Sequence, residues 1–308
     1  MYVKENRITK GGTYVLCFIL ALLFVRNFKA TNMYVYDGIY FSVKKIIPAF
    51  FPYMIITDFL LKTGSISFVC APLCAFFKKA NITAEAAAPC ITGLLCGAPV
   101  SARTVKELYE SGRLTSEESD ALLCAANPTS PAFIICAVGC GMLGSVRIGV
   151  FIWSFSFLIS FLCALFFLPK NSQKEIPTRA SESSKRNTLE ALNLSIKDAA
   201  VSVINISSVV VFFYTLSHTL SDIMAEFELS GSIIAFVCGL FEIGVGCDMS
   251  TYSPYLQKEL CAFIVGFGGI SVLMQVKCEA HSSAKLSKYL VSKLLCGLLC
   301  SLFVFLLL

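Results

Sequence analysis

The chain has 308 residues, of which 56% are apolar and only 15% carry a charge, whereas soluble domains carry about 25% charged residues. Several uncharged runs approach the ~20 residues that a helix needs to cross a bilayer. The composition therefore predicts an all-α, polytopic membrane helix bundle and excludes a soluble globular fold. The net charge of +5 forms no basic stripe interleaved with aromatic residues, so we expect no nucleic-acid partner.

The 15 cysteines lie mostly inside apolar runs. Three pairs are spaced four residues apart: Cys70 and Cys74, Cys136 and Cys140, Cys296 and Cys300. This spacing places two thiols on one helical face, which in a membrane helix is more typical of packing than of metal ligands. His218 and His281 have no ligand-spaced neighbours, so the sequence predicts neither a metal site nor a cofactor.

The first uncharged run spans residues 11–25. Three basic residues precede it, and Arg26 and Lys29 close it. No small-x-small cleavage site follows cleanly, so we expect an uncleaved first membrane helix rather than a secretory signal. The positive-inside bias then predicts a cytoplasmic N-terminus.

Further uncharged runs divide the chain into two halves. The runs of the first half are 46–57, 63–77, 86–102, 121–146 and 148–169. A polar stretch at 170–198 separates them from the runs at 199–221, 229–241, 260–276 and 294–308. We therefore predict two related halves with broken or re-entrant helices: a first membrane half at 1–169 and a second at 199–308, separated by a solvated linker at 170–198.

Helix-weakening residues interrupt several of these runs. They are Gly93, Gly97, Pro99, Pro128 and Pro131 in the first half, and Gly239, Gly244, Gly246, Gly266, Gly268 and Gly269 in the second. Unpaired backbone in a membrane is tolerated only where it lines a cavity or is buried in protein. Broken helices in both halves therefore indicate a transporter with half-helices around a central site. The alternative is that Gly and Pro are simply common in membrane helices.

The same segments resemble a known family. GLLCGAPVSARTVKEL at 93–108 is followed by YESGRLTSEESDALLCAANPTSPAFI, and the second half contains GLFEIGVGC at 239–247 and GFGGISVLMQV at 266–276. In this order the blocks resemble the YlbJ-like sporulation integral membrane proteins of the nucleoside-recognition or Gate domain superfamily. Ser101 and Arg103 stand where that family has Gly and Lys, and Ala98 replaces an aromatic residue.

This resemblance implies transport of dipicolinate, a small anionic metabolite, into the forespore during sporulation. It implies a location in the cell membrane, or in the outer forespore membrane. Two alternatives stay open: a Gate-type carrier of a nucleoside or a metal ion, and a non-transporting membrane scaffold for sporulation. We do not expect an enzyme, because no nucleophile-base pair or metal-ligand motif is visible. The expected partners are the small anionic solute and the lipid bilayer, and the sequence identifies no protein partner.

The chemistry of an anionic solute selects candidate substrate-binding residues at the breaks. Gly97 and Pro99, and likewise Gly268 and Gly269, would open the N-terminal ends of half-helices, whose free N–H groups attract anions. Arg103 would add a planar cation that suits a carboxylate. Alternatively, its side chain extends to the membrane interface beside a neighbouring lysine.

Glu242 stands in an otherwise uncharged run from Gly239 to Cys247, and an intramembrane carboxylate is costly enough to indicate function. It could exchange a coupling proton, bind a cation or pair with a cationic group when the site is empty. The structural alternative is a pair with Arg103 or with another buried base. The remaining predicted substrate-binding residues are Ser101, Asn127, Ser130, Ser271 and Gln275. We expect the breaks of both halves to border one shared cavity.

Overall fold

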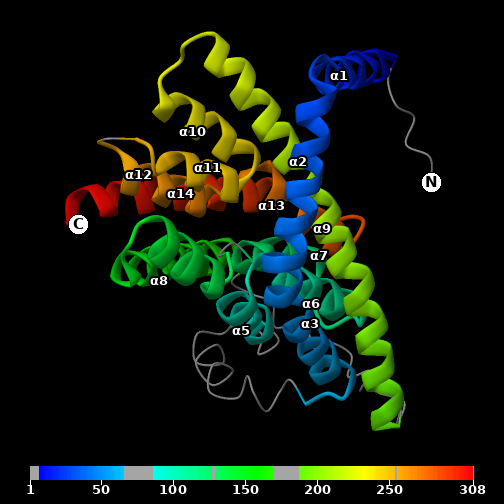
Figure 1. Ribbon diagram of the computed structural model, residues 1–308. Coiled ribbons are helices and arrows are strands. Elements are labelled where there is room, and N and C mark those ends of the chain that lie inside the picture. Colours follow the sequence, from blue (N-terminus) through cyan, green and yellow to red (C-terminus); the bar gives the residue numbers. More distant parts are fainter. Residues whose placement is uncertain (1–6, 66–85, 127–128, 170–186, 254, 308) are drawn as a thin grey trace.

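The computed structural model describes residues 7–65, 86–126, 129–169, 187–253 and 255–307 (Figure 1). Most of these residues are helical, and none of the described segments forms a strand. Four helical stretches are long and apolar enough to cross a membrane, and a bent pair near the N-terminus could supply a fifth. The prediction of an all-α, multi-pass membrane bundle is therefore confirmed.

The helices of the first half follow one another closely. They are α1 (Arg7–Arg26), α2 (Phe28–Phe41), η1 (Ser42–Ile46), α3 (Ile47–Lys62), α5 (Ala87–Cys96), α6 (Ala98–Glu110), α7 (Ser116–Leu122), η3 (Leu123–Ala126), η4 (Ala132–Met142) and α8 (Val146–Phe167). Both η1 and η4 are π-helices. The predicted first membrane helix is α1, which meets α2 and η1 at an angle of 99°. Most of the predicted run at 63–77 lies outside the described residues.

The second half begins with a long helix. Its elements are α9 (Thr188–Glu226), α10 (Gly231–Phe241), α11 (Ile243–Ser250), α12 (Gln257–Phe267), α13 (Gly269–Glu279) and α14 (Ser287–Leu307). The last 11 residues of the predicted linker, 188–198, form the first turns of α9, which Asn187 caps. Residues 170–186 of that linker lie outside the described segments.

Contacts between the two halves unite them into one bundle. Helix α14 packs against both α12 and α8, and the three run side by side (Figure 1). Helix α9 crosses the molecule obliquely and contacts α2 and α3 as well as α10 and α13. Helix α6 packs against α13. Both halves therefore contribute to the core around the helix breaks.

Two of the breaks that the sequence predicts, at Gly97 and at Gly268, are present, and a third is shifted. Pro128 of the predicted Pro128–Pro131 break lies outside the described residues, and Gly93, Gly239 and Gly266 lie inside helices rather than at breaks. Helix α5 ends before Gly97, whose φ of +90° suits glycine, and Pro99 lies in the first turn of α6. Gly268, at φ +83°, separates α12 from α13. The predicted break at Gly244 and Gly246 lies instead at Glu242, which ends α10 and caps α11.

Gly246 remains important, although for packing rather than for the break. A Cβ placed there would stand 2.6 Å from the backbone nitrogen of Gly239. Real Cβ atoms do not come this close to backbone atoms, so α11 can fold against α10 only because Gly246 lacks a side chain. This close approach fixes where the residue between the two helices, Glu242, lies.

We expect Gly246→Ala to lower the free energy of unfolding by about 1–3 kcal/mol, because the added methyl overpacks the α10–α11 contact. The control is Gly231→Ala, since a Cβ at Gly231 meets nothing within 4 Å. Both variants gain the helix propensity of alanine, so only the clash differs. Thermal unfolding of the purified protein in detergent measures the effect. Equal midpoints for the two variants would contradict the close packing of α10 on α11.

Candidate functional site

The helix breaks meet each other in pairs. A Cβ on Gly97 would lie 2.7 Å from the backbone nitrogen of Ser130, so the α5–α6 break packs against the start of η4. A Cβ on Gly269 would lie 3.0 Å from the carbonyl oxygen of Gly239 and 3.1 Å from that of Phe241. The α12–α13 break therefore packs against the end of α10. Each break in the described segments is thus covered by protein.

A cavity of about 380 Å³ borders both pairs of breaks. This volume falls within the range of small-molecule sites. Aromatic rings line part of the cavity: Phe41, Phe50, Tyr53 and Phe133. Its polar lining consists of Lys44, Lys45, Thr129, Ser130, Glu242 and Gln275. The cavity therefore combines an aromatic wall with two cations, one carboxylate and several hydrogen-bonding groups.

Two π-helices form part of the cavity wall. Lys44 and Lys45 belong to η1, whereas Ala132, Phe133 and Cys136 belong to η4. π-Helical turns are rare and occur frequently at functional sites, because the extra residue redirects side chains relative to a regular helix. Lys44 also places its ammonium nitrogen 5.4 Å from the centre of the Tyr40 ring.

Three of the predicted substrate-binding residues line this cavity: Ser130, Glu242 and Gln275. Ser130 accepts the backbone N–H of Phe133 at 3.4 Å, which helps to start η4. Gln275 donates from Nε2 to the hydroxyl of Ser271 at 3.2 Å. Ser271 therefore orients the Gln275 side chain without lining the cavity itself. The structure therefore brings together polar residues that lie more than 140 positions apart in the sequence.

Glu242 has a structural as well as an electrostatic role. It is 6% exposed, and its carboxylate accepts the backbone N–H of Val245 at 2.8 Å. This is an N-cap, which satisfies a backbone donor at the start of α11. The negative charge also suits the positive end of that helix. Glu242 is therefore held in place by the helix break while it faces the cavity.

Several other predicted residues support the breaks without lining the cavity. Ser101 is fully buried and donates its hydroxyl to the carbonyl oxygen of Pro89 at 2.7 Å, which ties α6 to α5. A Cβ on Gly268 would lie 2.6 Å from the ammonium nitrogen of Lys293. The helix ends at Gly97, Pro99, Gly268 and Gly269 are thus packed against protein, which leaves them no part in the cavity wall. Asn127 lies outside the described residues.

Arg103 lies in an ion cluster rather than along the cavity. Its guanidinium group contacts the carboxylate of Asp58 at 2.5 Å and donates to the backbone oxygen of Asp198 at 3.1 Å. It also donates to the hydroxyl of Ser202. Neither predicted role for Arg103, as a solute ligand or as an interfacial side chain, describes this buried position. Among the described residues, Glu242 forms no ion pair with Arg103.

Four helices contribute to this ion cluster, which we define as Asp58, Lys62, Arg103, Glu107, Asp198 and Glu279. Lys62 contacts Asp198 at 2.7 Å and Asp58 at 3.6 Å. Glu107 and Glu279 lie 3.8 and 4.0 Å from Arg103. The cluster therefore connects α3 and α6 to α9 and α13.

The lysines of the cavity were not among the residues that the sequence predicted. Lys44 and Lys45 immediately precede the uncharged run at 46–57, where a basic pair is ordinarily assigned to the membrane surface. The signal that could have found them is the Phe50–Pro52 segment downstream. Pro52 lies inside α3, and a proline within an uncharged run indicates an irregular helix beside the two lysines. Only the cavity lining, which η1 shares with Ile243 of α11 and Gln275 of α13, shows that these lysines face a cavity.

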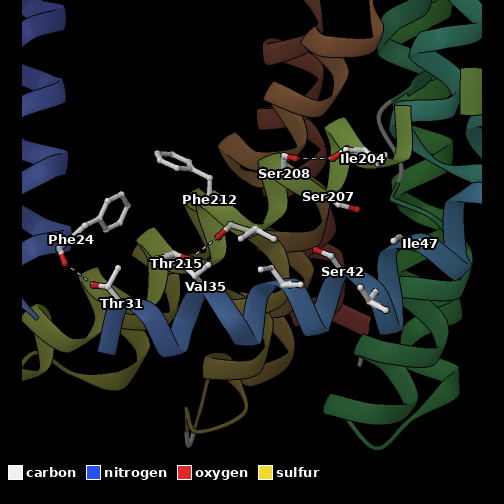
Figure 2. A pocket seen from close by; sticks show the side chains of 13 residues that line it. Phe24, Thr31, Val35, Ser42, Ile47, Ile204, Ser207, Ser208, Phe212 and Thr215 are labelled. Carbon is white, nitrogen blue, oxygen red and sulfur yellow. Dashed lines mark hydrogen bonds between the residues drawn. The ribbon is translucent and has the colours of Figure 1, made fainter. Parts of the chain in front are cut away.

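A larger groove of about 560 Å³ lies between α2 and α9, and it is apolar apart from hydroxyl groups. Figure 2 shows two of these hydroxyls bonded within the bundle: Thr31 donates to the carbonyl of Phe24 at 3.0 Å, and Thr215 to that of Val211 at 2.8 Å. Neither end of the groove carries a charged side chain. It therefore lacks the groups that would bind a polar solute in a membrane.

His281 contacts two serines, Ser283 in its own turn at 3.0 Å and Ser119 on α7. Ser119 Oγ lies 2.7 Å from His281 Nε2, and Tyr109 stacks on the imidazole with centroids 4.0 Å apart. Burial lowers the pKa of His281. Ser119 is fully buried, so no substrate can reach its hydroxyl in this conformation. The contact fastens the α13–α14 turn to α7.

Comparison with protein-family models, with curated proteins and with solved structures finds no match. The resemblance to the YlbJ-like proteins therefore rests on the sequence blocks at 93–134, 239–247 and 266–276. The structure places parts of all three blocks at the breaks around the cavity. Membership of that family stays a prediction.

We expect Arg103→Gln to lower the free energy of unfolding by about 3–5 kcal/mol, because it leaves the buried carboxylate of Asp58 without its closest cation. Arg147→Gln is the matched control, since Arg147 is exposed on α8. Thermal unfolding in detergent again measures both. If the two variants have the same midpoint, the Asp58–Arg103 pair contributes nothing to the fold.

Proposed function

We propose that this protein is a membrane transporter of a small anionic metabolite, which binds in the cavity beside Lys44, Lys45 and Gln275. The observation that carries the proposal is the cavity itself: broken helices from both halves meet around it, and two cations line it. An anion that leaves water needs such partners, because an unpaired charge in a membrane is costly. Broken helices around a central cavity are also the arrangement of many transporters.

The lining favours a solute that is both aromatic and doubly negative. Lys44 and Lys45 can each bind one carboxylate, and the rings of Phe41, Tyr53 and Phe133 can contact an aromatic ring. Dipicolinate has a pyridine ring between two carboxylates, so its chemistry agrees with this lining. The resemblance to the YlbJ-like proteins supports the same solute. We therefore propose dipicolinate transport into the forespore, across the outer forespore membrane, as the specific function.

Glu242 would balance the charge of the two lysines while the cavity is empty. A solute with two carboxylates would then replace the carboxylate of Glu242 as the partner of the two lysines. Such competition weakens binding, yet it lets the solute leave again, which a transporter requires. A site with only positive charges would hold the anion and release it slowly.

Uptake into proteoliposomes tests this function directly. The purified protein is reconstituted, and labelled dipicolinate, uridine and Mn²⁺ are offered separately. We expect uptake of dipicolinate above that of protein-free vesicles. Uptake of uridine or Mn²⁺ in its place would favour the Gate-type carrier of a nucleoside or metal ion. No uptake of any of the three would favour a sporulation scaffold.

We expect the double variant Lys44→Gln, Lys45→Gln to reduce dipicolinate uptake at least about tenfold. A hydrogen bond to a charged group contributes about 1.5–3 kcal/mol, and 1.4 kcal/mol corresponds to about a factor of ten. Lys29→Gln serves as the control, because Lys29 is exposed on α2 and does not line the cavity. Uptake by the double variant equal to that of Lys29→Gln, at equal protein per vesicle, would rule out the lysines as solute ligands.

Substitutions of Glu242 separate its charge from its capping role. Glu242→Gln keeps an oxygen that can accept the N–H of Val245, so we expect little change in thermal stability. Without the competing charge, both the apparent KM and the maximal uptake rate should fall. Glu242→Leu also removes the cap, which should cost about 1 kcal/mol of stability. Unchanged uptake kinetics in Glu242→Gln would show that the carboxylate does not act on the solute.

A further inference from the structure

The ion cluster contains more acids than bases. Arg103 and Lys62 face four carboxylates, those of Asp58, Glu107, Asp198 and Glu279. Lys106 belongs to none of these ion pairs, but its positive charge acts on Glu279. Even with this third cation, one negative charge stays uncompensated when every carboxylate is ionised.

Burial makes this excess charge costly. The side chain of Asp58 is 1% exposed and that of Glu279 is 7% exposed. Carboxylates that share a buried site cannot all remain ionised near neutral pH, so the group retains a proton. Asp198, whose side chain is 47% exposed, gives the cluster a route to solvent along which that proton can exchange.

We propose that the ion cluster is a proton-binding site whose carboxylates share one exchangeable proton near neutral pH. Within the proposed function, on which this part rests, that proton is the one coupled to transport. The cluster residues line neither cavity, and the sequence analysis assigned a proton to none of its carboxylates.

Glu107 is the carboxylate that holds the proton. It lies on α6, outside the candidate membrane spans. Burial and the nearby Asp58 raise the pKa of Glu107 to about 7, against the opposing effects of Lys62 and Arg103. The other charged groups that face it are Asp198 on α9 and, across the cluster, Glu279 on α13. Its ionisation therefore changes in the physiological pH range.

The position of the cluster explains how a proton there could affect the cavity. Lys45 and Asp58 lie 13 positions apart, or about 20 Å along the continuous η1–α3 helix. The cluster also joins α6 and α13, the two helices that begin at the breaks of Gly97 and Gly268. Protonation of one carboxylate removes a partner of Arg103 and weakens the tie between these helices and α3 and α9.

Infrared difference titration of the purified full-length protein tests the site without any solute. We expect the wild type to lose one protonated-carboxyl band as the pH rises through about 7, and Glu107→Gln to lack this change. Glu117→Gln, which alters an exposed residue of the adjacent helix α7, should keep it. A wild type without this band, or a Glu107→Gln variant that retains it, would overturn the proposal.

A second variant keeps the test decisive if Glu107→Gln does not fold. Glu279→Gln removes one negative charge from the cluster, so the same band should titrate at a lower pH than in the wild type. An unshifted titration would contradict a shared proton. Because no solute is present, these results stand whether or not the vesicles take up dipicolinate. A failed uptake assay with an intact titration rejects the proposed function and leaves the proton site in place.

Discussion

The structure depends on the requirement that backbone polar groups in a membrane be covered by protein. A helix that stops inside the bundle exposes N–H and C=O groups, and this chain covers them by packing one break against another. Gly97 lies against Ser130, and Gly269 lies against the carbonyls of Gly239 and Phe241. Such contacts require glycine because the backbones approach so closely. The cavity forms where the two pairs of breaks face each other, so the same requirement that pairs the breaks also creates a place for a solute.

Charge is distributed around this arrangement in two separate groups. One group faces the cavity, where Lys44 and Lys45 stand opposite a single carboxylate, Glu242. The other is the ion cluster, in which Arg103 is surrounded by carboxylates and is unavailable to a solute. The first group is accessible and has an excess of positive charge, which suits an anion. The second is largely buried, opens to solvent at Asp198 and has an excess of negative charge, which suits a proton.

The sequence was sufficient for the fold class, because long uncharged runs have no other stable use than membrane helices. It also located two breaks, since Gly97 and Gly268 each carry a local signal. It misplaced the break at Gly244 and Gly246, because glycines that permit close helix packing look the same in sequence as glycines that end a helix. The function of Arg103 was not predictable either: its partners Asp58 and Asp198 lie 45 and 95 residues away. No local pattern records which charges meet across such distances.

The separation of the two charged groups along one helix bears on how they could be coupled. Residues of η1 and the start of α3 line the cavity, whereas the far end of α3 carries Asp58 and Lys62. A regular helix transmits displacement along its axis with little loss, because its hydrogen bonds must all shift together. Pro52 lies inside α3 and removes one of those hydrogen bonds. The helix is therefore weakest beside the cavity, between the lining residues Phe50 and Tyr53 and ahead of the cluster, at the point where a movement of one end relative to the other would have to bend it.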